Sequence, residues 1–556
     1  MVTPLGEGSE CNYEALCQGR SELKPRPGAF GLPETFVGSL LPRDCWNEKL
    51  KDMPGRDGLT LFEALCIYCI SQAAGNADLS DSDTIFILSS TKGNVDLLET
   101  NPDDPRAYLD WSARKIAGHF GNRNTPVTVS NACVSGVCAQ LMAARMIRSG
   151  QYRRAVVVGG DLLSRFIVSG FQSFKALSPE VCKPFDANRT GLNLGEAFGA
   201  IILEATDHVC ESDWVYVASS NHNDANHISG PSRTGEGSYR VLRDLLKHVD
   251  ATELAFVNLH GTATNYNDEM ESIAVDRAGL APVPVNGLKG YFGHTLGAAG
   301  VIETIMSMQA VDHGTIIPTR GFSGQGTSRK LNVTDAPRAT DKKGFHKTAV
   351  GLRRLQRRYM LQERRCRMRL LKQVEIQPGC LKTDGNRIDS LCGLSLSEIY
   401  RKVCNGYPKF FKMDGLCKTG FVAAELLLEG LTPEQKAEGS VILFGRAGSL
   451  ATDRNYENTI RDPENYYPSP ALFVYTLANI VTGEIAIRHK MQGESSMYVL
   501  PEYDSKAEIR TVQSAFDESD TPLIVSGWVD YENDDNYQAI LNLYTKDQIL
   551  QLWKNL

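Results

Sequence analysis

The sequence shows no long apolar run, no pattern typical of a secretory leader and no cluster of paired cysteines. No stretch of about 18 or more apolar residues occurs, so no transmembrane helix is predicted. The first residues, MVTPLGEGSE, show neither a basic start nor an apolar core, which argues against a signal peptide and predicts a cytoplasmic protein. Among 14 cysteines, Cys66 and Cys69 have CxxC spacing without a second pair, so neither a metal site nor a disulfide framework is predicted.

Charge and length exclude further classes. The formal net charge of −7 gives no reason to expect nucleic acid as a partner. With 556 residues, of which 42% are hydrophobic, the chain is long enough to bury large cores in more than one domain.

Short runs rich in Val and Ile alternate with amphipathic stretches in the first part of the chain. Four of these runs have the composition of buried strands: RRAVVVGGD, EAFGAIILE, ELAFVNLHG and APVPVNGLKG. Each lies near a segment with helical periodicity. This alternation predicts an α/β fold.

Cys133 stands where an extended apolar run gives way to a helical one. In TPVTVSNACVSGVCAQLMAARMI, Val127 to Val129 alternate with threonine as in a strand, and Val134 to Ile147 recur with helical spacing. The free N–H groups and positive dipole at a helix start favour a thiolate over a thiol. We therefore predict that Cys133 is a nucleophile, whereas the other cysteines are interpreted as small buried residues.

Two histidines follow in glycine-rich segments, His260 in NLHGTATNYND and His294 in KGYFGHTLGAAG. Lys289 lies five residues before His294. With Cys133 they form a candidate catalytic set.

Four motifs in this order resemble those of the β-ketoacyl-acyl carrier protein synthases, the condensing enzymes of fatty-acid and polyketide assembly. ACVSG carries the cysteine, KPFDANRTGLNLGEAFGAIILE resembles PFDxxRxGxxxGEGAG, and HGTATNYND and KGYFGHTLGAAGVIE match the two histidine motifs. The resemblance covers about residues 1–345. It implies the thiolase-like fold, an αβαβα arrangement of five layers, usually in a dimer.

The resemblance also implies a reaction, the decarboxylative Claisen condensation of acyl and malonyl thioesters in fatty-acid or polyene/polyketide biosynthesis. Cys133 would carry the acyl group, and His260 and His294 would donate hydrogen bonds to the enolate oxygen. Lys289 would orient His294, and Glu303 would support the site.

The substrates of this family arrive on the phosphopantetheine arm of acyl carrier protein, so no bound cofactor and no metal are expected. The resemblance implies that Thr262 and Thr264 hold this arm. Asp268 has two interpretations: it serves the site, or it caps the helix MESIAVDRAG as an N-cap carboxylate.

Three rival functions share some of these features. A thiolase would need a second cysteine in place of two histidines, and a cysteine protease gives no reason for the GHTLGAAG segment. The third is a non-catalytic chain-length-factor-like or scaffolding partner of a condensing enzyme. Cys133 argues against it for the first domain.

A departure from the family pattern occurs at residues 351–358. Family members carry a closing Gly-Phe-Gly-Gly-x-Asn-Ala segment, where this chain has GLRRLQRR. Codons for Gly-Phe-Gly-Gly-Cys-Asn-Ala-Ala, read one base early after an added G, give these same eight residues, which favours a frameshift affecting residues up to about Arg367. The alternative is a basic amphipathic helix that contacts a membrane or partner.

This departure has a predicted consequence. Arg353 and Arg354 replace the glycine pair, and burying them unpaired would cost roughly several kcal/mol each. We expect the segment to swing out, the core strand to stay unformed and the synthase to be poorly soluble or impaired.

A segment of different character begins at Met368 and resembles the N-terminal half of the same superfamily in degenerate form. If Thr482 and Gly483 correspond to the residues that follow Cys133, Ile480 occupies the nucleophile's position. This half would then carry no acyl group, which supports a non-catalytic role for it.

The predicted organisation is therefore a β-ketoacyl synthase domain at 1–345, a basic junction at 346–367 and a degenerate synthase-like half at 368–556. The expected partners are acyl carrier protein and a second synthase subunit, in a homodimer or a heterodimer.

Overall fold

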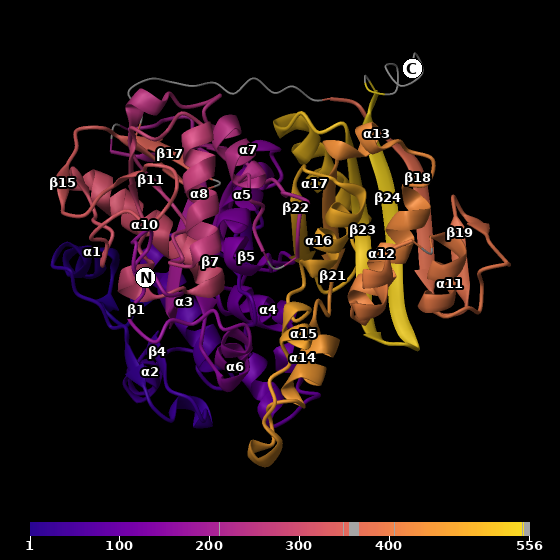
Figure 1. The fold of residues 1–556 in the computed structure, drawn as a ribbon, viewed down its shortest axis with the longest axis horizontal. Helices are drawn as coiled ribbons and strands as arrows, with labels where there is room; N and C mark the ends of the chain where they lie inside the picture. Colours follow the sequence, from indigo (N-terminus) through magenta and orange to yellow (C-terminus); the bar gives the residue numbers. More distant parts are fainter. Residues whose placement is uncertain are drawn as a thin grey trace.

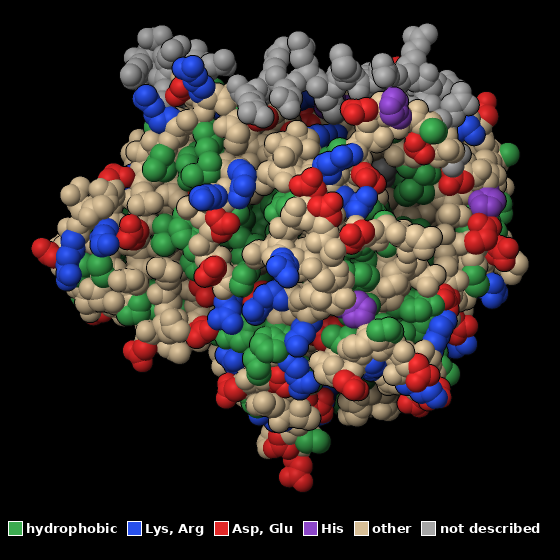
Figure 2. Space-filling view, turned by 180° about the vertical axis from the view of Figure 1, so that it is seen from behind, with side chains coloured by type: hydrophobic (Ala, Val, Ile, Leu, Met, Phe, Trp, Pro, Cys, Tyr) green, Lys and Arg blue, Asp and Glu red, His purple; other side chains and the backbone are tan. Residues whose placement is uncertain are grey.

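The computed structural model describes residues 1–210, 212–228, 230–348, 350–354, 366–404, 406–547 and 549, with the backbone alone for 350–354. Within these residues, no helix combines the length and the apolar character that crossing a membrane requires. On the face seen in Figure 2, Lys and Arg side chains are interspersed with Asp and Glu side chains.

A twisted sheet of thirteen strands runs through the described part of the chain (Figure 1). Its first half, in spatial order, is β2 (Gly6–Glu7), β1 (Val2–Thr3), β9 (Ala197–Glu204), β7 (Arg154–Asp161), β5 (Thr84–Ser89) and β6 (Val127–Val129). Its second half is β22 (Ser495–Val499), β21 (Ser440–Gly445), β23 (Leu523–Asn533), β24 (Asn536–Lys546), β18 (Met368–Gln377), β19 (Cys380–Thr383) and β20 (Asn386–Arg387).

A second sheet belongs to the first part of the chain alone. Its six strands, in order, are β10 (Trp214–Ser219), β17 (Val350–Arg354), β16 (Gly344–Lys347), β11 (Leu254–Asn258), β12 (Pro284–Asn286) and β14 (Asn332–Val333). Two short sheets complete the described strands, β3 (Lys24–Arg26) with β4 (Phe36–Ser39) and β8 (Leu194–Gly195), and β13 (Thr315–Ile316) with β15 (Arg338–Ala339).

Helices cover both sheets and fill the space between them. Between the sheets lie α5 (Ser135–Arg148) and α10 (Ala299–Asp312), because each contacts strands of both. The outer face of the large sheet carries α3 (Leu61–Ala74) and α4 (Leu109–His119), and α7 (Glu236–Leu245) and α8 (Asn265–Arg277) pack on the small sheet. The first part of the chain thus has the five predicted αβαβα layers, with α1 (Ser9–Cys17), α2 (Arg43–Leu50), α6 (Arg165–Ser173) and α9 (Lys289–Phe292) at its margins.

The four runs interpreted as strands are β7, β9, β11 and β12, and most of their residues are buried, although the second half of β9 is partly exposed. Runs of Val and Ile suit these positions because helices or a second layer cover both faces of each sheet.

Counted outward from the middle of the large sheet, the strands of its two halves pair in the same pattern. β5 is parallel to β6 and β7, and β7 is antiparallel to β9, which pairs with β1. Likewise β21 is parallel to β22 and β23, and β23 is antiparallel to β24, which pairs with β18. The two halves meet where β6 and β22 pair antiparallel, with Val129 opposite Tyr498. Residues 366–547 therefore form a second, smaller thiolase-like half domain.

The helices of this half domain follow the same plan. α12 (Gly415–Leu427) packs on β18, β23 and β24, and α17 (Ser505–Glu518) packs on β23 and against α5. The remaining helices are α11 (Leu396–Val403), α13 (Pro433–Ala437), α14 (Leu450–Glu457), α15 (Pro470–Val474) and α16 (Ile480–His489). Every strand described in residues 366–547 belongs to the large sheet, so this half has no described counterpart of the small sheet.

Two buried ion pairs cross the contact between the halves. Lys92 Nζ lies 2.7 Å from Asp453 Oδ1, and Arg145 contacts Glu494 with both terminal nitrogens, at 3.0 and 2.7 Å. All four side chains are less than a tenth exposed. Because an unmatched buried charge is costly, this pairing shows that the two surfaces fit each other in charge as well as in shape.

The expectation that the arginine-bearing segment swings out is wrong for Val350–Arg354. These residues form β17, which pairs antiparallel with β16 on one side and with β10 on the other. Ladder hydrogen bonds join backbone groups, so replacing glycines by other residues does not remove them. Residues 355–365 lie outside the described part of the chain. The domain boundaries expected after residues 345 and 367 stay predictions.

Candidate active site

Cys133 lies in a short 3₁₀ turn, Ala132–Val134, between β6 and α5, at the predicted junction of strand and helix. The preceding residue, Ala132, has φ 49°, a left-handed conformation that residues with a Cβ seldom adopt. The Ser135 hydroxyl ties the turn together, because it accepts from the Asn131 N–H at 2.8 Å and donates to the Ala132 carbonyl at 2.6 Å.

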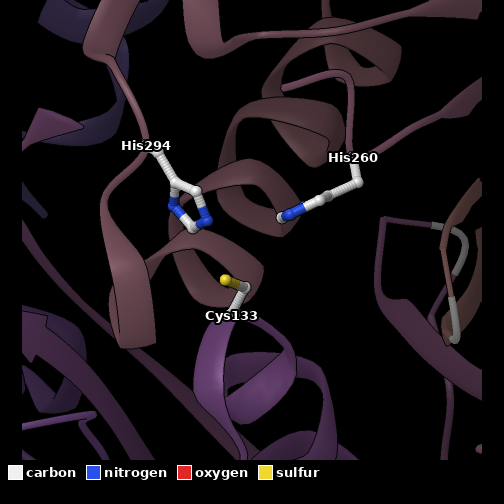
Figure 3. Close-up of side chains that lie close together, drawn as sticks. All are labelled: Cys133, His260 and His294. Atoms are coloured by element: carbon white, nitrogen blue, oxygen red, sulfur yellow. The ribbon is translucent and has the colours of Figure 1, made fainter. Parts of the chain in front are cut away.

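Three side chains from separate elements converge at this turn (Figure 3). The Cys133 sulfur and one ring nitrogen each from His260 and His294 lie within 4.8 Å of one another. The two imidazole rings are 5.1 Å apart and nearly perpendicular, at 86°. The structure therefore brings together the cysteine and both histidines that the sequence singled out.

His294 has a fixed tautomer. Its Nδ1 accepts a hydrogen bond of 3.0 Å from the Leu296 N–H, so the proton of the neutral ring is on Nε2. Nε2 is buried and has no hydrogen-bond partner among the described residues. A buried, unpaired N–H in a reaction site is a donor ready for a substrate oxygen.

The loop that carries His260 follows β11 and is held at three points. The Glu271 carboxylate accepts from the N–H of His260 at 2.7 Å and from the N–H of Gly261 at 2.8 Å. Lys289 Nζ donates to the His260 carbonyl at 2.6 Å. Glu271 was not predicted, although its place in the helix after HGTATNYND was a usable signal.

Among the described residues, no hydrogen bond joins Lys289 to the ring of His294. Its ammonium group instead pairs with Glu303 Oε1 at 2.7 Å, and a second lysine, Lys347, pairs with Glu303 Oε2 at 2.7 Å. All three side chains are at most 4% exposed. Lys347 was missed because it lies outside every quoted motif.

These charges set the protonation of the site. Burial, followed by the charge of Lys289, lowers the pKa of both His260 and His294 well below its ordinary value. Burial alone would raise the pKa of Glu303, but Lys289 and Lys347 reverse this and lower it. At neutral pH the site thus holds two neutral imidazoles beside an ionised glutamate.

The thiolate predicted at Cys133 is wrong for this structure. Burial raises the pKa of the Cys133 thiol to about 11, and the charge of Lys289 opposes this only in part. The physical reason is that the protein around the sulfur removes more water than the helix start and the lysine can replace. Cys133 rests as a thiol.

Thr262 and Thr264 face each other, with their hydroxyl oxygens 2.9 Å apart. Asp268 lies within the first turn of α8, so its interpretation as an N-cap is wrong; Thr264 takes the N-cap position. The Asp268 carboxylate accepts from the N–H groups of Phe185 at 2.7 Å and Ala263 at 3.2 Å, and burial raises its pKa to about 7.

Known proteins with similar sequences are β-ketoacyl synthases. The family model of the β-ketoacyl synthase N-terminal domain matches residues 94–208, and that of the C-terminal domain matches residues 215–323. The chain is 31% identical to 3-oxoacyl-[acyl-carrier-protein] synthase 2 of Rhizobium meliloti, over 60% of this chain and 89% of that protein. It is 29% identical to a putative mitochondrial 3-oxoacyl-[acyl-carrier-protein] synthase of Schizosaccharomyces pombe, over 58% of this chain and 86% of the relative.

The chain belongs to the β-ketoacyl synthase family. The matched residues include Cys133, His260, Lys289, His294 and Glu303. A solved structure titled PfaC Keto synthase-Chain length factor is similar over 98% of this chain and 77% of its own, with a TM-score of 0.73 and 13% identity. This likeness concerns the fold alone, and it extends over both halves of the synthase.

A small cavity of about 130 Å³ opens beside Cys133. Its apolar wall comes mainly from α5 and α7, with Val134, Val137, Leu141 and Val241. The loop Ser220–His222 and the end of β16 close its polar side. No motif indicated this loop, because its place beside Cys133 depends on how the two sheets stack.

The second half of the synthase has no cysteine at the matching position, but the residue differs from the prediction. Cys133 lies four residues after β6, and Tyr503 lies four residues after β22, the strand that β6 faces. Ile480 instead begins α16, which connects β21 to β22 as α4 connects β5 to β6. The predicted match of Ile480 with Cys133 is therefore one helix too early in the chain. The Tyr503 hydroxyl donates to Glu508 at 2.7 Å.

Cys133, His260 and His294 are also a set that a thiophilic metal could use, since a sulfur and two imidazoles are ligands of zinc.

Proposed function

We propose that this chain is a β-ketoacyl-acyl carrier protein synthase in which residues 1–354 catalyse the decarboxylative condensation of acyl and malonyl thioesters. The observation that carries the proposal is the convergence of Cys133, His260 and His294, with the unpaired Nε2–H of His294 directed into the site.

The first step is acyl transfer to Cys133. Its sulfur attacks the carbonyl carbon of the acyl thioester, and the thiol proton passes to the sulfur of the carrier. A new carbon–sulfur bond forms at Cys133 as the bond to the carrier's sulfur breaks. The carrier thiol leaves with the proton.

The second step is decarboxylation and condensation. Loss of CO₂ from the malonyl thioester leaves an enolate, whose oxygen accepts hydrogen bonds from His260 and His294. Each such donor contributes about 2.7–4 kcal/mol to the transition state. The enolate carbon attacks the acyl carbonyl, so a carbon–carbon bond forms as the carbon–sulfur bond to Cys133 breaks. The Cys133 thiolate then takes a proton from water, which restores the starting state.

The carrier of both substrates is acyl carrier protein with its phosphopantetheine arm. The paired hydroxyls of Thr262 and Thr264, two and four residues after His260, support binding of the amide groups of this arm. No bound metal or cofactor enters this scheme.

The second half, residues 366–547, is non-catalytic in this proposal and acts as a chain-length-factor-like partner. Tyr503 in place of a nucleophile supports this role, as does the pairing of β22 with β6. The half occupies the edge of the large sheet that a separate synthase subunit would otherwise use.

The test is acylation of the full chain with an acyl thioester of the carrier, followed by peptide mass spectrometry. We expect one acyl adduct, on Cys133, and none in Cys133→Ala. An adduct that persists elsewhere in Cys133→Ala at the wild-type rate would refute the assignment of the nucleophile. Condensed product from acyl and malonyl carriers then tests the reaction itself.

A further inference from the structure

The turn that carries Cys133 is hydrogen-bonded to the second half of the chain. The Asn131 side chain, 1% exposed, accepts a hydrogen bond of 2.7 Å on Oδ1 from the N–H of Met497 in β22. Asn131 lies two residues before the nucleophile. The strand that pairs with β6 therefore also fixes the entrance to the nucleophile's turn.

The turn needs such a contact because Ala132 is held in a left-handed conformation, φ 49°. A strained residue keeps its conformation only where the surrounding structure determines it. Ser135 holds the turn from within α5, and Met497 holds it from the other half. Without the second contact, relaxation of Ala132 would turn the Cys133 sulfur away from the two imidazoles.

A second route leads from the same strand to the cavity beside Cys133. Asn221 Nδ2 donates to the Ser495 carbonyl at 3.2 Å and to the Ser496 hydroxyl at 3.1 Å. His222 Nδ1 lies 3.0 Å from the Gln492 carbonyl, and its Nε2 lies 2.6 Å from the Asp244 carboxylate. Both residues line the cavity, whereas no described residue of the second half does.

We propose that the segment 492–497 of the second half is a positioning element for the condensation site. It holds the Cys133 turn through Asn131, and it holds the cavity wall through Asn221 and His222. The second half thus acts on the reaction without contributing an atom that touches the substrate. This inference rests on the proposed function, because it assigns a task to the site defined there.

A purely structural role of the contact between the halves predicts that any lost hydrogen bond across it has the same effect. The test therefore compares Asn131→Leu with Tyr108→Phe. Asn131→Leu removes the acceptor for Met497. Tyr108→Phe removes a hydrogen bond of 2.9 Å to Glu532 in the second half, at a residue that does not line the cavity beside Cys133. Asn131→Asp keeps an acceptor oxygen and serves as the conservative variant.

The first readout is the rate at which iodoacetamide alkylates Cys133, followed across pH by peptide mass spectrometry. In Asn131→Leu we expect a displaced pH profile for Cys133 and a fall of about tenfold or more in the rate of acyl transfer, with KM unchanged. Asn131→Asp should recover most of the acyl transfer, and Tyr108→Phe should match the wild type in both readouts.

The proposal is overturned if Asn131→Leu and Tyr108→Phe give the same alkylation profile and the same rates. If Asn131→Leu does not fold, Asn221→Leu replaces it, with a raised KM expected because the cavity wall loses its anchor; an unchanged KM overturns the proposal. Alkylation needs no condensation, so a chain that alkylates normally but never condenses contradicts the proposed function and leaves this test valid.

Discussion

Lys347 pairs with the same buried carboxylate as Lys289. Each ammonium group lies 2.7 Å from one oxygen of Glu303, so two cations lie beside the reaction site where the motifs predicted one. Both charges lower the pKa of His260 and of His294. Lys347 thereby helps to keep both imidazoles neutral, which is the state in which His294 Nε2 donates while Nδ1 accepts.

Lys347→Met tests this electrostatic role. Removing one cation raises the pKa of both histidines, and protonation of His294 Nδ1 would break its bond from Leu296. The acid limb of the condensation rate should therefore move to higher pH, by roughly one unit. Lys330→Met, at an exposed lysine, is the control. Identical pH profiles for the two variants would contradict the role given to Lys347.

His294→Ala should separate the two half-reactions. Acylation of Cys133 should continue, while condensation falls by about two to three orders of magnitude, as expected for a lost oxyanion donor. The same holds for His260→Ala. Single-turnover acylation and steady-state condensation measure the two steps. Equal losses in both would mean that the histidines act on the thiol or on folding.

The sequence predicted the catalytic cluster better than its electrostatics. Cys133, His260 and His294 stand in recognisable motifs, and each motif fixes a local turn. The pKa of Cys133 could not be predicted, because it depends on how much water the stacked layers exclude, which local sequence does not determine. Lys347 was missed for a similar reason, since it reaches Glu303 only when β16 lies beside α10.

The second half shows the same limit. Its synthase-like character was evident, but the position of its lost nucleophile was not. The sequence does not reveal the order of the strands, so Ile480 was matched with Cys133 only through Thr482 and Gly483, the small residues that follow it. The topology moves the match to Tyr503, because β22 rather than α15 takes the place of β6.

Asp268 predicts a pH dependence of stability. Its pKa is raised to about 7 by burial, so the folded protein holds a proton on it that the unfolded chain releases near pH 4. This contribution to stability is complete below pH 4 and is lost as pH rises through 7. Wild type should therefore lose unfolding free energy relative to Asp268→Asn between pH 5 and pH 8, measured by urea denaturation. A constant difference between the two proteins would refute the raised pKa.

The ion pair between Lys92 and Asp453 should bind the halves together. Lys92→Met leaves Asp453 buried without its partner, which should cost about 3–5 kcal/mol of unfolding free energy. The double variant Lys92→Met with Asp453→Leu should recover most of this loss. Lys51→Ala, in an exposed pair with Glu48, is the control and should change little. A double variant no more stable than Lys92→Met would show that the charge is not the cause.

The closing segment gives the last prediction. β17 forms in this chain despite the arginines, so poor solubility no longer follows from an unformed strand. The resemblance to the family predicts Phe-Gly-Gly at the positions of Leu352, Arg353 and Arg354, where glycine would let the backbone approach the substrate. Restoring all three by Leu352→Phe, Arg353→Gly and Arg354→Gly should leave soluble yield unchanged and raise condensation by about tenfold or more, since small displacements at a reaction site cost this much. Arg367→Gly, at an exposed arginine beyond the strand, controls for the loss of charge. Equal condensation in the triple variant and wild type would show that the segment serves the site as it stands, and would favour a chain selected as one unit over a frameshift product.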